Sequence, residues 1–232
     1  MPMSYAVGMN PEPPTGWSAR LELGLERRGG RTVLAVKRQL GPLTVQRPFY
    51  PEGGVCHLYV LHPPGGVVGG DGLDLDIEVG TRAHALVTSP GATKFYRSAG
   101  PLAVQHQRLR VRDGGVLEWF PHEGILFHGA RLQSRTRIEL AGSARFVGWD
   151  IISLGRPVIG ERFDAGRADL ALMILRDGRP LLSERLRLST ASDLDGPSGL
   201  RGQPICATFV ASGASNDDLA AARAHLRTPE GL

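Results

Sequence analysis

The chain has 232 residues, with 27 basic and 23 acidic side chains and a formal net charge of +4. A chain of this length can bury a substantial core, and all-β proteins of this size commonly form one domain. Its basic side chains are scattered singly, which argues against nucleic-acid binding. No apolar stretch approaches the ~20 residues of a membrane span, and the proline-containing start lacks the apolar segment of a signal peptide.

Apolar and polar residues alternate with a period of two through most of the chain, the pattern of half-buried strands. Residues 1–16 precede this pattern and are expected to form a disordered tail, so residues 17–232 are expected to form a single β domain. Residues 19–36 predict a β-hairpin with its turn at 27–31. Leu73, Leu75, Ile77 and Val79 predict the clearest single strand. The other strands are expected at 43–47, 57–61, 83–88, 102–111, 116–120, 132–140, 144–151, 170–175 and 181–188.

Turn signals separate these segments, as at Asp113-Gly114-Gly115 and Asp177-Gly178. Short strands at this spacing predict an all-β stack of antiparallel strands rather than βαβ units. One helix is expected near the C-terminus, where Ser215 or Asn216 could cap an alanine-rich segment ending at Leu226. The sequence shows no linker and no repeat.

Two cysteines and two lysines limit the chemistry of the chain. Cys56 and Cys206 are far apart and lack CxxC spacing, so neither a disulfide framework nor a zinc ribbon is predicted. A reducing, cytoplasmic location fits this pattern. Lys37 and Lys94 are the only lysines, and the many arginines suit partner interfaces and carboxylate contacts. A codon bias toward arginine explains that composition equally well.

The familiar motifs of nucleotide binding and covalent catalysis are missing. The glycine-rich segment from Gly65 to Asp71 lacks the Lys-Ser/Thr of a P-loop, and no helix pattern follows it. Its paired glycines better fit a tight backbone course past a neighbouring strand or a partner. Ser89 and Thr93 lie near Lys94, but no SxxK or GxSxG pattern supports a covalent nucleophile.

Four histidines, His57, His62, His122 and His128, invite interpretation as a metal site. Along an extended strand, a gap of six residues separates two side chains by roughly 20 Å unless the chain bends. No HxH or HxxxH pair is present. A packed or surface role is therefore favoured for each histidine taken alone.

Two carboxylates occupy positions where the alternation predicts buried side chains. Glu184 shares its face with Leu182 and Leu186, and Asp150 lies in a strand that is apolar on both faces. A buried carboxylate is costly unless it is paired, hydrated or bound to metal. One interpretation is an internal bridge to arginine. The other is a hydrated polar channel or cation-handling lining formed by Asp71, Thr93, Asp150 and Glu184.

Several distinctive motifs follow one another along the chain, at residues 41–52, 56–71, 92–98, 117–119 and 155–161. In this order they resemble those of the UreD family of urease accessory proteins, also called UreH. The resemblance runs from Trp17 to about Leu188 and continues more weakly to Leu226. The motif residues that carry it include Cys56, His57, His62, Gly69, Gly70, Lys94, Tyr96, Arg97, Glu118 and Trp119.

The resemblance implies a cytoplasmic, non-enzymatic scaffold with an elongated, superhelical all-β fold and one or two short helices. It implies binding to apo-urease together with UreF and, through UreF, the GTPase UreG, which brings nickel for insertion into urease. No tightly bound cofactor is implied. An internal nickel tunnel has been proposed for the family. The resemblance places its transient Ni²⁺ contacts at Asp71, Asp150 and Glu184, and Thr93 is a further lining residue where relatives have a serine.

The chain also departs from the family pattern. His122-Glu123-Gly124 and Phe127-His128-Gly129 differ from the residues usual there, and the chain ends at Leu232 where relatives continue with further strands and a helix. The competing hypothesis is a β-sandwich hydrolase or isomerase that uses His122 and Glu123 as acid and base. Adjacent strand residues point to opposite faces, so this pair would need a bulge to act together. A carbohydrate- or nucleic-acid-binding module is disfavoured by the lack of aromatic runs and basic clusters.

Overall fold

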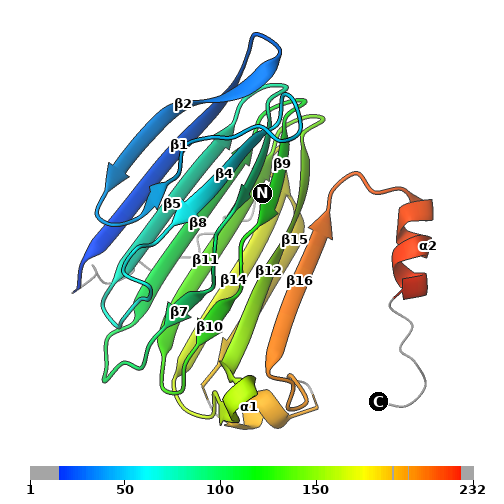
Figure 1. Cartoon of the computed structure of the whole chain (residues 1–232). Coiled ribbons are helices and arrows are strands. Elements are labelled where there is room, and N and C mark those ends of the chain that lie inside the picture. The colour runs from blue at the N-terminus through cyan, green and yellow to red at the C-terminus, as the bar shows by residue number, and fades with distance from the viewer. Residues whose placement is uncertain (1–15, 190, 198, 226–232) are drawn as a thin grey trace, which may run out of the picture.

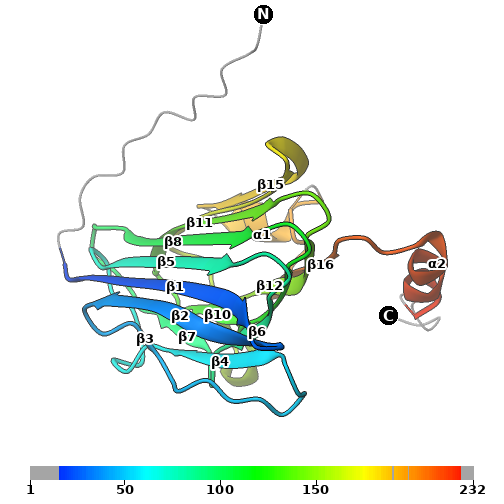
Figure 2. The same ribbon diagram turned by 90° about the horizontal axis from the view of Figure 1, so that it is seen from above.

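The computed structural model describes residues 16–189, 191–197 and 199–225, and within these ranges the strands form two sheets that face each other (Figures 1 and 2). Apart from Gly16, the predicted N-terminal tail lies outside the described residues. The seven-stranded first sheet has the order β15 (Arg179–Leu188), β14 (Arg167–Arg176), β11 (Arg131–Leu140), β8 (Ala103–Val111), β5 (Gly72–Val79), β1 (Ser18–Arg28) and β2 (Arg31–Leu40).

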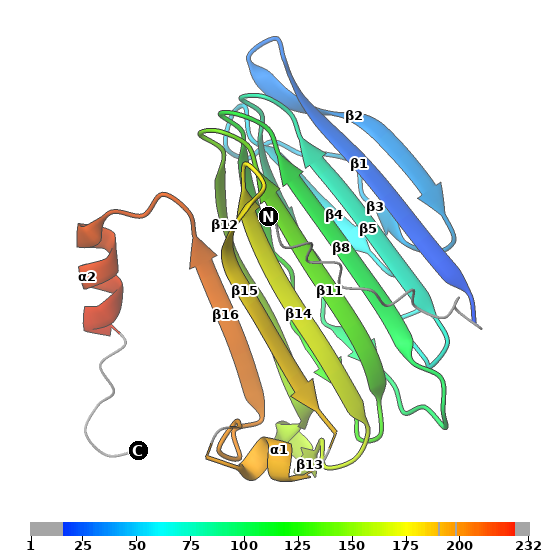
Figure 3. The same cartoon turned by 180° about the vertical axis from the view of Figure 1, so that it is seen from behind.

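The second sheet contains nine of the described strands. Its main path runs β3 (Thr44–Val45), β4 (Cys56–Leu61), β6 (His84–Thr88), β9 (Val116–Phe120), β12 (Arg145–Arg156), β10 (Gly124–Leu126) and β7 (Thr93–Phe95). Strand β12 also pairs with β13 (Glu161–Arg162) and β16 (Ile205–Ala211). The predicted elongated all-β stack is therefore confirmed, as is the β1–β2 hairpin, which Figure 3 shows at one edge.

The direction of pairing differs from the predicted antiparallel one along the middle of both sheets. Strands β1, β5, β8, β11 and β14 pair in parallel, and so do β4, β6, β9 and β12. The chain passes repeatedly from one sheet to the other, so the strands that pair in parallel are not adjacent in sequence. Apolar alternation fixes the buried face of a strand, but it does not fix the direction of its neighbour.

The core lies between the two sheets, where the inward apolar residues meet. Leu21, Ile77 and Leu109 of the first sheet and Leu117 and Phe146 of the second are at most 2% exposed. Each sheet contributes every second residue of a strand to this core, as the period of two predicts. The interior is therefore largely apolar, and polar side chains on the inner faces stand out.

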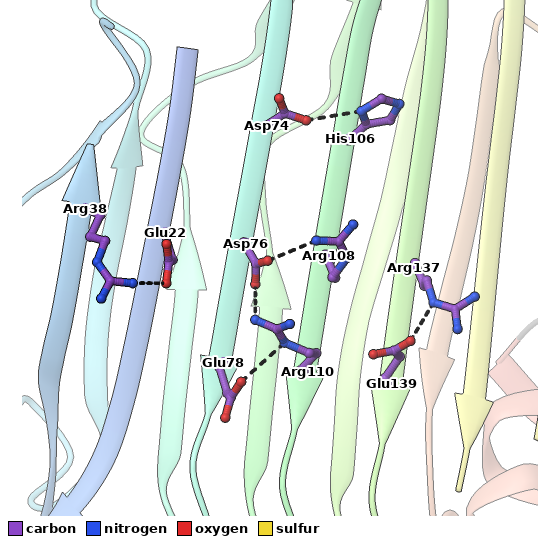
Figure 4. Close-up of polar contacts among 10 residues, drawn as sticks. All are labelled: Glu22, Arg38, Asp74, Asp76, Glu78, His106, Arg108, Arg110, Arg137 and Glu139. Atoms are coloured by element: carbon purple, nitrogen blue, oxygen red, sulfur yellow. Dashed lines mark hydrogen bonds and ion pairs between the residues drawn. The ribbon is translucent and has the colours of Figure 1, made fainter. Parts of the chain in front are cut away.

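The outer face of the first sheet is charged (Figure 4). Asp76 of β5 pairs with Arg108 at 3.2 Å and Arg110 at 2.7 Å, and Asp74 contacts His106 at 3.1 Å. The two residues of each pair are 32 or 34 positions apart, because one turn of the superhelix brings β8 beside β5. Exposed pairs of this kind contribute about 0–1 kcal/mol each.

The helices lie at the margins of the two sheets, and the predicted C-terminal one is confirmed. Helix α2 (Asn216–His225) begins after Ser215, whose hydroxyl accepts a hydrogen bond from Asp218 N at 3.1 Å while Asp218 accepts one from Ser215 N at 2.8 Å. This reciprocal pair is a capping box. Figure 1 shows α2 standing away from the sheets. The other helices are α1 (Ala191–Asp195) and a short 3₁₀ turn, η1 (Pro157–Ile159).

Candidate functional site

The first of two interior cavities lies beneath the loop that joins β6 to β7. It has a volume of about 210 Å³, and its polar lining includes His62, Thr93, Gln105 and Gln107. Exposed Pro90 and Gly91 stand at its rim, so the cavity opens toward solvent there. The segment from Ser89 to Thr93, part of one of the sequence motifs, thus forms the mouth of this cavity.

The glycine-rich segment before β5 packs tightly beside this cavity. A Cβ atom on Gly66 would overlap the ring of Tyr96, and one on Gly69 would overlap the hydroxyl of Ser98. The amide of Gly70 donates to the carbonyl of Leu102 at 2.9 Å. These contacts show that the paired glycines permit close packing against neighbouring segments, as expected from the sequence.

His62 and Asp71 lie close together beside the first cavity. Asp71 is 1% exposed and accepts a hydrogen bond from Val68 N at 2.9 Å. The His62 ring stacks on Trp17 with centroids 5.3 Å apart, and its buried Nε2 has no hydrogen-bond partner among the described residues. Burial lowers the pKa of His62, and the charge of Asp71 opposes that shift. The lowered pKa favours the neutral form of the His62 ring.

The second cavity, about 370 Å³ in volume, lies where β15, β14, β12 and β16 meet. Asp150 and Glu184 line it together with Cys206 and Thr208, and the Thr208 hydroxyl donates to Glu184 at 2.9 Å. Glu184 is on the inner face, as predicted, yet it is exposed because the cavity is open at this edge. Two carboxylates from opposite sheets therefore face one space.

The electrostatics of the second cavity decide between the two sequence interpretations of its carboxylates. Among the described residues, neither Asp150 nor Glu184 forms an ion pair, and Arg135 and Arg185 instead bind Asp169 on the outer face. Burial raises the pKa of Asp150, and the charge of Glu184 raises it further. Among the described residues the arginine bridge is therefore not formed, and both carboxylates line the cavity.

A small third space, the neck, shares lining residues with both cavities. Its volume is about 10 Å³; it shares Gln107 and Trp119 with the first cavity and Asp150, Leu172 and Thr208 with the second. A space of ~10–15 Å³ holds about one water molecule. The lining residues of the three spaces thus overlap in series between the sheets, from Thr93 near the loop at Pro90 to Glu184 at the open edge.

Of the four residues predicted to line a tunnel, three line these spaces directly. Thr93 is at the first mouth, Asp150 is at the neck and in the second cavity, and Glu184 is at the second mouth. Asp71 lies behind His62 rather than on the lining. The sequence analysis missed Gln107, although it is a polar residue at an inward position, the same signal that identified Glu184.

The other predicted histidines are scattered. His57 is buried against Phe49, His128 pairs with Asp164 at 2.8 Å, and exposed His122 lies 3.7 Å from Glu123. Neither His122 nor Glu123 lines a cavity described above, so the structure gives the acid–base hypothesis no substrate site. Within the described ranges, no group of three or more His, Cys, Asp or Glu residues could hold a metal ion.

The remaining motif residues mainly support the fold. Tyr96 packs edge-on against Phe127 at 4.9 Å, and Glu118 pairs with His84 at 2.6 Å. Cys56 is fully buried, and burial raises its pKa. Trp119 is also buried and forms part of the neck. Lys94 and Arg97 are exposed near the first mouth.

The fold and cavities together define a class of protein: an all-β scaffold whose two sheets enclose cavities that carry polar side chains. None of the helices in the described ranges is long and apolar enough to span a bilayer. A family model described as the UreD urease accessory protein matches residues 18–231. The chain therefore belongs to the UreD family of urease accessory proteins.

Individual relatives agree with this assignment. The chain is 54% identical over 212 residues to the urease accessory protein UreD of Alcanivorax borkumensis, covering 90% of this chain and 72% of the relative. It is 49% identical over 223 residues to UreD of Pseudomonas putida strain W619, covering 95% and 79%. UreD of Alkalilimnicola ehrlichii is 46% identical over 235 residues, covering 99% and 80%.

Proposed function

We propose that this chain is a non-catalytic scaffold in urease maturation that passes Ni²⁺ through its interior. In this proposal it binds apo-urease in the cytoplasm together with UreF and, through UreF, the GTPase UreG, and it assists GTP-dependent nickel insertion. The observation that supports the transit role is the series of spaces that share lining residues from Thr93 to Glu184, with Asp150 left free of arginine. Family membership supports the maturation role.

The chemistry of the lining suits transit better than storage. The charge of Glu184 at the second mouth attracts a divalent cation, because a cleft lined by one sign of charge raises the local concentration of the opposite ion. Oxygen donors along the route give Ni²⁺ contacts without the fixed cluster of ligands that holds a metal tightly. Conduction requires sites that are weak enough for the ion to leave.

The maturation role is tested with the cognate urease, expressed with its other accessory proteins and nickel, in the presence and absence of this chain. We expect nickel-poor, inactive urease without the chain, and restored nickel content and specific activity with it. Equal nickel content in both preparations would overturn the proposal. If the chain acts as a scaffold and not as an enzyme, the restored nickel content of urease should depend on the amount of accessory complex formed.

A further inference from the structure

Both sheets line the neck between the two cavities, and each contributes polar and apolar side chains. Gln107 of β8 and Thr136 of β11 lie on the inner face of the first sheet, and the Thr136 hydroxyl donates to Gln107 Oε1 at 2.9 Å. Opposite them, the second sheet contributes Trp119, Phe146 and Gly148. The neck thus has a fixed amide on one side and rings on the other.

Gly148 shows how closely the second sheet approaches this space. A Cβ atom at Gly148 would lie 2.5 Å from the backbone oxygen of Trp119 and 2.9 Å from the ring of Phe146. No side chain fits at Gly148 without moving backbone, so the wall at this point consists of main chain and the rings of Trp119 and Phe146. The neck cannot widen on that side without moving the second sheet.

The size of the neck restricts what can pass. A volume of about 10 Å³ accommodates about one water, whereas a divalent cation with its full hydration shell is several times larger. An ion in the neck must therefore leave most of its water behind. Removing a charge from water is costly unless protein oxygens replace the lost contacts.

Gln107 is placed to supply such a contact on the side of the first cavity. Asp150 and Thr208 line the neck from the side of the second cavity. Side-chain amide oxygens are ligands for hard divalent cations. The amide oxygen of Gln107 has two lone pairs, so it can accept the hydrogen bond from Thr136 and still contact an ion.

We propose that Gln107 is a positioning residue for the transported divalent cation: held by Thr136, its amide oxygen replaces water as the ion crosses the neck toward Asp150. This inference rests on the proposed transit of nickel. A neutral amide suits the task because it stabilises the partly dehydrated ion without holding it. A further carboxylate beside Asp150 and Glu184 would instead trap the cation.

Two substitutions of similar size separate these roles. Gln107→Leu keeps the width of the neck and removes the oxygen, and Gln107→Glu keeps an oxygen and adds a charge. In the complete accessory complex supplied with Ni²⁺, we expect Gln107→Leu to slow nickel loading of apo-urease about tenfold, as for loss of one polar contact. We expect Gln107→Glu to slow delivery while nickel accumulates on the washed accessory complex, measured by mass spectrometry of the metal.

The matched control is Gln133→Leu, which makes the same change on the outer face of β11. Recovery of the intact complex shows that each variant folds. If Asp150→Ala slows loading but Gln107→Leu loads as fast as wild type, this inference is overturned and the transit role stands. If neither variant slows loading, the transit role falls, and this inference with it. Equal nickel retention by Gln107→Leu and Gln107→Glu would also overturn the inference about Gln107.

Discussion

Asp150 is the residue at which function and stability oppose each other most directly. It is largely buried, it faces Glu184, and no arginine among the described residues compensates it. Burial and the neighbouring charge raise its pKa, so the folded protein binds a proton at this site more readily than the unfolded chain. The free energy of unfolding therefore falls as the pH rises from the ordinary carboxyl pKa through the raised one.

Replacing Asp150 with asparagine should stabilise the chain and impair its function. At neutral pH, Asp150→Asn removes a buried charge, and we expect the free energy of unfolding to rise by about 1 kcal/mol. Nickel loading of urease should fall because a cation contact is lost. Urea unfolding and the nickel content of urease measure the two effects.

The matched control for this prediction is Asp74→Asn, on the outer face of the first sheet. Asp74 is 55% exposed and contacts only His106 among the ion pairs of the described residues, so both measurements should stay close to wild type. Unchanged nickel loading in Asp150→Asn would remove Asp150 from the route. The stability gain should vanish at acidic pH, where Asp150 is protonated.

Asp169 shows the opposite electrostatic situation on the outer face. Its carboxylate binds Arg185 at 2.7 and 2.9 Å and Arg135 at 2.8 and 3.2 Å, and its side chain is 10% exposed. The hydrogen bonds from Arg185 and then from Arg135 hold the pKa of Asp169 far below its usual value, against the opposing effect of burial. This network joins β11, β14 and β15.

Asp169→Asn should therefore destabilise the chain. We expect a loss of about 2 kcal/mol at pH 7, less than for a fully buried pair because the arginines are partly exposed. A group with a lowered pKa stabilises the fold above its ordinary pKa, and this contribution is lost as the pH falls below about 4. The difference between wild type and variant in urea unfolding should shrink over that range; a constant difference would contradict this assignment.

The sequence predicted single residues well where parity alone decides their position. Glu184 is on the inner face because it shares parity with Leu186, and the same reasoning would have found Gln107 and Thr136. It could not predict that Asp150 faces Glu184, because these residues are in different sheets and 34 positions apart. Nor could it assign the arginines to Asp169, since that depends on which strands are neighbours.

At the scale of elements, the positions of the longer strands before β16 followed from the sequence, whereas those of the short strands β7, β10 and β13 and the strand partners did not. Apolar alternation located β5 and β9 almost to the residue, and the turn at residues 27–31 located the β1–β2 hairpin. β16 was missed because Cys206, Ala207 and Thr208 weaken its alternation. Its pairing with β12 forms one wall of the second cavity, so the site was incomplete without it.

Strand β16 carries two large exposed apolar side chains, Ile205 at 56% and Phe209 at 64% exposure. Among the described strands it pairs only with β12, so one of its edges has no strand partner. An exposed apolar edge strand promotes association with other chains. We expect Phe209→Lys to reduce self-association of the purified chain in sedimentation velocity experiments.

The control for Phe209→Lys is Val158→Lys, which adds the same charge in η1. Val158 is 99% exposed and belongs to no strand, so its replacement changes net charge without changing a sheet edge. Equal reduction by the two variants would assign self-association to net charge rather than to β16. Recovery of wild-type self-association in high salt by both variants would have the same meaning.

At the scale of the whole molecule, the chain alternates between the two sheets, so the stability of each strand depends on contacts with both sheets. A strand such as β8 contacts parallel neighbours in its own sheet and packs across the core against the other sheet. Stacked repeats can unfold in separate parts when each contacts only its neighbours. Here the two sheets share one core, so the single domain predicted from the sequence implies that they unfold together.

A core substitution in either sheet should therefore lower the free energy of one unfolding transition that both sheets share. Leu21 of β1 and Leu154 of β12 are both buried, and replacing either with alanine should cost about 3 kcal/mol. Hydrogen exchange in increasing urea, read by mass spectrometry, reports the opening free energy of each strand separately. In Leu21→Ala, the slowest-exchanging amides of β12 should lose as much protection as those of β1, because both exchange through global unfolding. Unchanged protection of β12 would mean that the stack unfolds in two parts and would contradict a single cooperative domain.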